Sequence, residues 1–178
     1  MSTDPAPPTP FDKFSVPSFD TFYDCYYQEL LSETLSKRWQ FLDNFTSIIV
    51  ALTATGSGVA AWTIWNTVSG KTLWAVVAGT AAVASVVNIG LKVPDRIKEQ
   101  ELLYRLFQDL RLAIDNFRGN LRIDMGTMDE ARKEYDRLQA GYQEAMKKAK
   151  PDMFYSSSMA AAVEAKLKDI LKEKRYIL

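Results

Sequence analysis

Residues 103–121 read LYRLFQDLRLAIDNFRGNL, the most regular pattern in the chain. Apolar residues recur there at alternating spacings of four and three, which places them along one face of a helix. This spacing predicts a coiled-coil seam that packs against another helix. The sequence leaves two partners open: a helix of the same chain, such as 18–43, or a second copy in a homo-oligomer. The seam consists of Leu103, Phe107, Leu110, Ile114, Phe117 and Leu121.

Signals around the seam predict further helices. An aromatic and aliphatic stripe with helical spacing predicts a helix over 18–44, after a proline-rich tail over 1–17 that we expect to be disordered. Beyond the seam, a Thr-x-x-Glu capping box and a serine N-cap mark two further starts. We therefore expect cytoplasmic helices within 94–178, at about 95–120, 127–150 and 158–175.

Composition excludes several classes of function. The chain has 22 basic and 22 acidic residues, so no net basic field attracts a nucleic acid polymer. It has no histidine and one cysteine, which removes the commonest general base, cysteine zinc clusters and intrachain disulfides. Carboxylates alternate with Arg and Lys three or four residues apart, the spacing that is typical of ion pairs on a helix surface. We therefore expect no catalytic residues, no cofactor, no metal site and no enzyme activity.

Charge is almost absent between Asn44 and Leu91, where Lys71 is the only charged residue. The two apolar stretches on either side of the turn 67–71 have about the length that a bilayer-spanning helix needs. The sequence thus predicts an all-α membrane protein: a two-helix transmembrane hairpin over 45–66 and 72–92, joined to a cytoplasmic helical bundle.

Basic residues flank both ends of this hairpin, which places both termini in the cytoplasm and the protein in the inner membrane. Tryptophans near the turn are typical of interface anchors; they are Trp62, Trp65 and Trp74. Small and hydroxyl or amide residues suit close helix packing or a pore lining. These candidates are Gly56, Ala60, Ala75, Gly79, Thr53 and Asn88.

Gly56 and Gly58 also begin a G-x-G-x-x-A match, the fingerprint of dinucleotide-binding turns. That fingerprint requires an amphipathic helix and an acidic residue about 20 positions further on. The first acid past Ala78 is Asp95, and the surrounding residues have no polar face. Helix packing explains these glycines better than nucleotide binding does.

The order of these features resembles a known family. The exit from the apolar region reads LKVPDRIKEQELLYRLFQDL, and later segments read EYDRLQAG and AKPDMFY. This arrangement, over about 20–170, resembles the SLATT-type two-transmembrane effector domain of bacterial conflict systems. The resemblance implies an oligomeric, pore-forming or membrane-disrupting effector in antiviral defence, activated by a sensor protein or a signalling nucleotide. Two alternatives stay open: a membrane-anchored adaptor that recruits a cytoplasmic partner, and a small ion channel.

Overall fold

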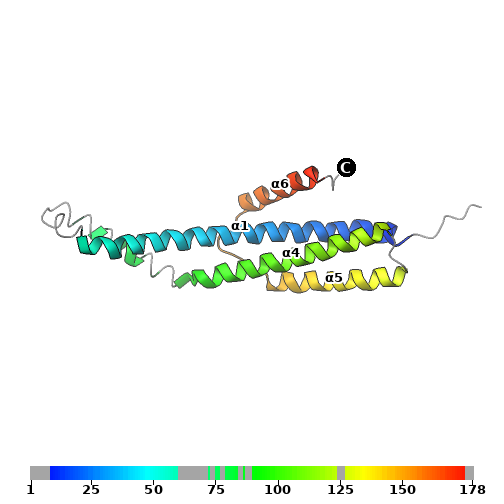
Figure 1. The fold of residues 1–178 in the computed structure, drawn as a ribbon, viewed down its shortest axis with the longest axis horizontal. Helices are drawn as coiled ribbons and strands as arrows, with labels where there is room; N and C mark the ends of the chain where they lie inside the picture. The colour runs from blue at the N-terminus through cyan, green and yellow to red at the C-terminus, as the bar shows by residue number, and fades with distance from the viewer. Residues whose placement is uncertain are drawn as a thin grey trace, which may run out of the picture. The chain divides into compact units, whose positions relative to one another are not determined.

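The computed structural model describes residues 9–59, 72, 75–76, 79–83, 86, 90–123 and 127–174, and the described elements are all α-helices (Figure 1). Helix α1 spans Pro10–Val59, and α4 spans Val93–Ile123. Helices α5, Met128–Lys148, and α6, Ser157–Glu173, follow. The helical part of the expected fold class is therefore present, whereas the membrane part is not, as described below.

The chain divides into two compact units. Unit 1 combines the residues up to Leu35 with those from Gln100 onward, and unit 2 comprises Ser36–Glu99. Helices α1 and α4 therefore contribute residues to both units. The two units are described separately below.

Helix α1 begins earlier than the sequence suggests. Residues 10–17, which we expected in a disordered tail, already belong to α1, so that part of the expectation is wrong. The hydroxyl of Thr9 accepts from the Asp12 amide at 3.3 Å, and the Asp12 carboxylate accepts from the Thr9 amide at 2.9 Å. These reciprocal bonds satisfy amides of the first turn, and Pro10 follows at a position where a missing N–H costs nothing.

The later helices begin at the expected signals. Thr127 and Glu130 form a reciprocal capping box at the start of α5. The side chain of Ser156 accepts from the Met159 amide at 3.2 Å and caps α6. Both arrangements supply partners for amides that a helix N-terminus leaves unsatisfied.

The core of unit 1 is built where the α4 seam meets an aromatic face of α1. Phe14 contacts Phe117 of α4 at a ring-centroid distance of 6.5 Å, and both rings contact Tyr135 of α5. Next to Phe117 in the sequence, the Arg118 guanidinium lies over the ring of Phe22 of α1, 5.2 Å from the ring centroid. Aromatic pairs in such edge and tilted arrangements add to the free energy gained by burying their area.

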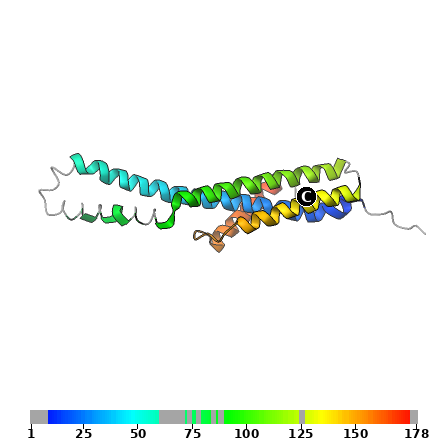
Figure 2. The same cartoon turned by 90° about the horizontal axis from the view of Figure 1, so that it is seen from below.

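Helices α5 and α6 complete the same core. In both views α4 runs alongside the part of α1 that belongs to unit 1 (Figures 1 and 2). Phe107 of α4 contacts Tyr142 of α5 at 6.5 Å. Helix α6 buries one residue per turn in this core, and Lys166 pairs with Glu33 of α1 at 3.8 Å. The buried residues of α6 are Met159, Val163, Leu167 and Leu171.

An ion pair crosses the interface between α1 and α4. The Arg111 guanidinium donates to the Glu29 carboxylate at 2.5 Å, and the two side chains are 14% and 6% exposed. The same guanidinium lies 4.5 Å from the Tyr26 ring centroid. Burial lowers the pKa of Arg111, but the hydrogen bond and the charge of Glu29 outweigh it and raise the pKa above its usual value. The arginine therefore stays charged inside the bundle.

The predicted transmembrane hairpin is wrong. Within the part of the chain that the structure describes, no helix is both long enough and apolar enough to cross a membrane. The same finding contradicts the multi-pass inner-membrane location and the description as a transmembrane protein.

Replacing Glu29 by leucine tests the contribution of the buried ion pair. Loss of the carboxylate leaves the Arg111 charge without its partner in the interior, so Glu29→Leu lowers the free energy of unfolding by about 3–5 kcal/mol. Urea denaturation followed by circular dichroism measures this change.

The matched control is Glu134→Leu. Glu134 pairs with Arg137 at 2.6 Å, but those side chains are 38% and 68% exposed, so its loss costs less than about 1 kcal/mol. Equal effects of the two substitutions would contradict a structural role for the buried pair.

Candidate functional site

A pocket of about 320 Å³ lies in unit 1 between α1, α4 and the segment that joins α5 to α6. Half of the lining residues are apolar and half are polar, but most of the surface that they expose to the pocket is apolar. The apolar lining residues are Leu31, Leu35, Leu103, Met146, Ala149 and Pro151. The polar ones are Gln28, Ser32, Gln100, Lys150, Asp152 and Tyr155.

Helical periodicity explains why these residues meet. On α1 the lining positions 28, 31, 32 and 35 follow one another at helical spacing and share one face. On α4, Gln100 and Leu103 are three residues apart and share a face in the same way. Helix α5 ends at Lys148, and Pro151, which lacks a backbone N–H, follows in the connecting segment. The chain then turns at the mouth of the pocket.

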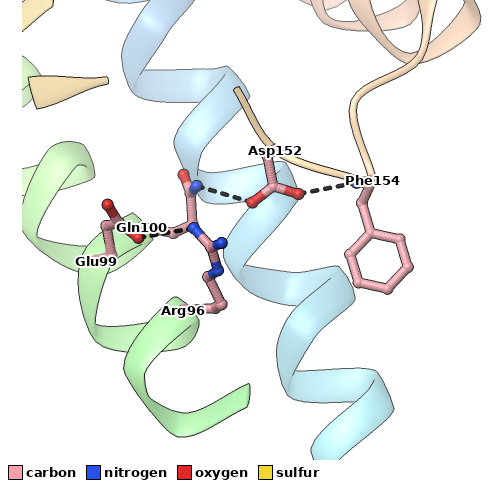
Figure 3. Close-up of polar contacts among 5 residues, drawn as sticks. All are labelled: Arg96, Glu99, Gln100, Asp152 and Phe154. Atoms are coloured by element: carbon pink, nitrogen blue, oxygen red, sulfur yellow. Dashed lines mark hydrogen bonds and ion pairs between the residues drawn. The ribbon is translucent and has the colours of Figure 1, made fainter. Parts of the chain in front are cut away.

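Asp152 holds this turn in place (Figure 3). One carboxylate oxygen accepts from the Gln100 side-chain amide at 3.0 Å, and the other accepts from the Phe154 backbone amide at 2.8 Å. The Tyr155 amide also donates to the backbone carbonyl of Asp152 at 3.1 Å. The connecting segment is thereby tied to α4, and the local turn that Asp favours is closed.

Figure 3 also shows an ion pair one turn earlier on α4. The Arg96 guanidinium donates to the Glu99 carboxylate at 3.1 Å, and both residues belong to unit 2. This is a helix-local pair of the i,i+3 type, which stabilises a helix by a few tenths of a kcal/mol. We assign it to local helix stability.

Titratable groups gather elsewhere in unit 1, around Cys25. Burial, followed by the nearby negative charge of Asp24, raises the pKa of the Cys25 thiol to about 12. Burial and Asp24 also raise the pKa of the Tyr142 hydroxyl to about 12, and that hydroxyl donates to the Asp24 carboxylate. Raised values keep the thiol and the phenol neutral, which is the opposite of what a nucleophile needs. Among the described residues, no group of His, Cys, Asp and Glu side chains could hold a metal ion.

The residues of the predicted seam lie inside unit 1. Leu103, Phe107, Ile114, Phe117 and Leu121 are buried there, and Leu110 is partly buried. They pack against residues of α1 and α5 of the same chain. Of the two partners that the sequence left open, the helix of the same chain therefore occupies this face.

The structure places few of the packing and pore candidates. Ala75 and Gly79 are exposed helical residues, and a Cβ added at Gly79 would meet no atom within 4 Å. Thr53 and Gly56 lie on the backbone of α1, and their side-chain surroundings are outside the description. Ala60, Asn88 and the expected anchors Trp62, Trp65 and Trp74 lie outside the described residues. Their expected role in helix packing, a pore lining or interface anchoring stays a prediction.

Comparisons with known proteins give no relative: no family model, curated protein or solved structure matches the chain. The resemblance to SLATT-type effector domains therefore stays a prediction. The same holds for the expected activation by a sensor protein or a signalling nucleotide.

Sequence reasoning missed the pocket. Its polar residues are ordinary surface types, and nothing in the pattern shows that Gln100 on α4 meets Asp152, which is 52 positions away. One local signal was available. The Pro151-Asp152 pair directly after a charged helix is typical of a turn, and an Asp in such a turn often accepts from a backbone amide two residues on.

Alkylation of Cys25 tests the description of the interior. Cys25 is fully buried, and its thiol stays protonated to a much higher pH than a free thiol, whose pKa is near 9. At pH 8 we expect iodoacetamide to modify the folded chain at least about a hundredfold more slowly than the urea-unfolded chain, because a fully buried thiol reacts only when the surrounding structure opens. Mass spectrometry of quenched time points measures both rates, and similar rates would contradict the burial.

The same groups predict how stability depends on pH. A group whose pKa is higher in the folded state stabilises fully below its unfolded pKa and loses that contribution as pH rises through its folded value. Cys25 and Tyr142 ordinarily titrate near 9 and 10 and do so near 12 in the folded chain. The free energy of unfolding therefore falls between about pH 9 and 12, as urea denaturation at each pH measures. In a Cys25→Ala chain the free energy of unfolding should decrease less over this pH range. An equal decrease in the variant and the parent chain would contradict the assignment to Cys25.

Proposed function

We propose that the chain is a helical effector or adaptor module that works by assembling with further copies of itself. The observation that carries this proposal is an exposed apolar strip on α1 within unit 2. We do not propose pore formation, because a pore requires membrane-spanning helices and the predicted transmembrane hairpin is wrong.

The strip on α1 consists of Phe41, Phe45 and Ile48. Their exposed fractions are 72%, 53% and 59%, which is unusual for large apolar side chains that share one face. The rings of Phe41 and Phe45 stack on each other, with centroids 6.3 Å apart and planes 14° apart. The spacings of four and three residues are those of a coiled-coil seam, and Leu52 continues them in the sequence.

A second strip occurs in the other described part of unit 2. Val76, Val83 and Val86 are 62%, 64% and 70% exposed, and Gly79 lies between them at matching spacing. The positions 76, 79, 83 and 86 follow spacings of three and four residues. Large apolar side chains that stay exposed along one face of a folded protein favour an interaction surface.

The spacing of the strips favours a second copy of the chain as their occupant. A seam with heptad spacing is self-complementary, because two identical helices related by a two-fold axis bury apolar residues against apolar residues. No charged residue occupies the strip positions on either segment, so symmetric pairing buries no charge there. The chain's resemblance to SLATT-type domains also implies an oligomeric effector in bacterial conflict, and we retain that role as part of the proposal.

The experiment is analytical ultracentrifugation of the purified chain over a range of concentrations. We expect reversible association, and we expect the triple variant Phe41→Gln, Phe45→Gln, Ile48→Gln to raise the dissociation constant at least about tenfold, since apolar anchors dominate such interfaces. The triple variant should keep the far-ultraviolet circular dichroism of the parent chain.

The matched control replaces three exposed apolar residues of α4. Leu102, Leu112 and Ile123 are 62%, 47% and 86% exposed and lie outside both strips. Changing all three to glutamine should leave the association unchanged. A parent chain that is monomeric at every concentration would contradict the proposal, and so would a control variant that dissociates as the strip variant does. A chain that is monomeric and sediments with phospholipid vesicles, but no longer does so as the strip variant, would show that the strip binds lipid and would contradict self-association.

A further inference from the structure

Ser32 is a buried polar side chain that faces the pocket of unit 1. It is 4% exposed, and its hydroxyl has no hydrogen-bond partner among the described residues. In the same part of the chain, no fully buried side-chain nitrogen or oxygen atom lacks a partner. The Ser32 hydroxyl is therefore open to space, and the space that it borders is the pocket. A hydroxyl held in this way offers both a donor and an acceptor to a molecule inside the pocket.

Two side-chain amides also line the pocket. Gln100 is 4% exposed and uses its side-chain nitrogen on Asp152, which fixes the orientation of the amide. Gln28 lies one helical turn before Ser32 on α1, and its side chain makes no hydrogen bond within the described chain. A few convergent polar groups on an otherwise apolar wall are characteristic of small-molecule sites.

The charges in the lining set the class of ligand. Lys150 and Asp152 are the only charged lining residues, and their charges cancel. Both oxygens of the Asp152 carboxylate already accept hydrogen bonds, so that carboxylate is engaged in holding the turn. Lys150 has an interaction of its own as well. A charged ligand would therefore lose its hydration against Leu31, Leu35 and Leu103 without an opposite charge dedicated to it. An uncharged molecule avoids this cost.

The volume sets the size of the ligand. At about 320 Å³ the pocket lies at the lower end of the range for small-molecule sites, which is about 300–1,000 Å³. Figure 3 shows how the connecting segment and α4 are bridged by Asp152, so the polar wall is held by bonds that exist without a ligand. A site whose walls are held in advance loses less free energy to ordering when a ligand binds.

We propose that this pocket binds an uncharged, mostly apolar small molecule of about two rings, which carries one hydroxyl or carbonyl group. The apolar part packs against Leu35, Leu103 and Met146. The polar group forms hydrogen bonds with the Ser32 hydroxyl and the Gln28 amide. This proposal is independent of self-association, because every residue in it belongs to unit 1.

The test uses 2-naphthol as the probe and the full chain as the receptor. Methyl resonances of selectively labelled methionine and leucine report binding by nuclear magnetic resonance, with the signal of Met146 at the rim of the pocket. We expect saturable shifts with 2-naphthol. Naphthalene-2-sulfonate, which has the same rings and a fixed negative charge, should bind at least about tenfold more weakly because it must shed its hydration.

Two variants distinguish this pocket from other apolar surface. Ser32→Ala removes the hydroxyl and should weaken 2-naphthol binding about three- to tenfold, the effect of one hydrogen bond. Ala149→Phe occupies the space and should abolish binding. The matched control is Ser18→Ala, since Ser18 is a fully buried serine of α1 that donates to the Ser15 carbonyl away from the pocket. Ser18→Ala should leave binding unchanged, and thermal melts establish that each variant is folded.

Several results would overturn the proposal. The first is a folded parent chain that gives no saturable shift up to the solubility limit of 2-naphthol. The second is equal binding of 2-naphthol and naphthalene-2-sulfonate, which would contradict the uncharged class of ligand. The third is binding that persists in folded Ala149→Phe, which would place the probe elsewhere on the chain.

Discussion

Burial of the α4 seam against the aromatic face of α1 is the contact on which the rest of unit 1 depends. It joins parts of the chain that are far apart in sequence, and it carries the Glu29–Arg111 ion pair within its apolar surroundings. An apolar seam alone tolerates sliding by a heptad, whereas a buried pair of opposite charges is satisfied in one register only. We therefore regard the ion pair as the feature that sets the register between the two helices.

The pocket follows from where this contact ends. Leu103 begins the seam, and one turn earlier the same row of α4 carries Gln100. On α1 the row that faces the pocket mixes Leu31 and Leu35 with a serine and a glutamine. The segment between α5 and α6 then crosses this mixed surface and is held there by Asp152. The pocket lies where the apolar core ends and polar side chains begin, below the turn that Asp152 holds. Its lining therefore contains both apolar and polar residues.

How much the sequence predicted can be seen from individual elements. Strongly periodic segments and cap signals were informative, because spacing along a helix and the needs of its first amides are local properties. The seam spacing places the apolar face of α4, and Thr127 with Glu130 marks the start of α5. The sequence did not show that α1 begins at Pro10, because the Thr9–Asp12 arrangement lies among prolines that suggested a tail. The contact between Gln100 and Asp152 depends on tertiary packing and has no local signal.

The wrong prediction has a different physical origin. Low charge and many small apolar residues between Asn44 and Leu91 suggested membrane-spanning helices. A surface that packs against another protein also has few charged residues. The strip of Phe41, Phe45 and Ile48 begins before that interval, at Phe41, which lies two residues ahead of Asp43. Hydropathy averaged over a window does not show which side chains of a helix are exposed and which are packed.

The central claim is that the α4 seam is buried by α1 within one chain. Hydrogen exchange followed by mass spectrometry, at two protein concentrations a hundredfold apart, tests it most directly. Our account predicts that amides of the buried stretches of α1 and α4 in unit 1 exchange slowly together, with the same protection at both concentrations. Protection of α4 that disappears on dilution while that of α1 remains would show that the seam is buried by another copy, and it would contradict the account.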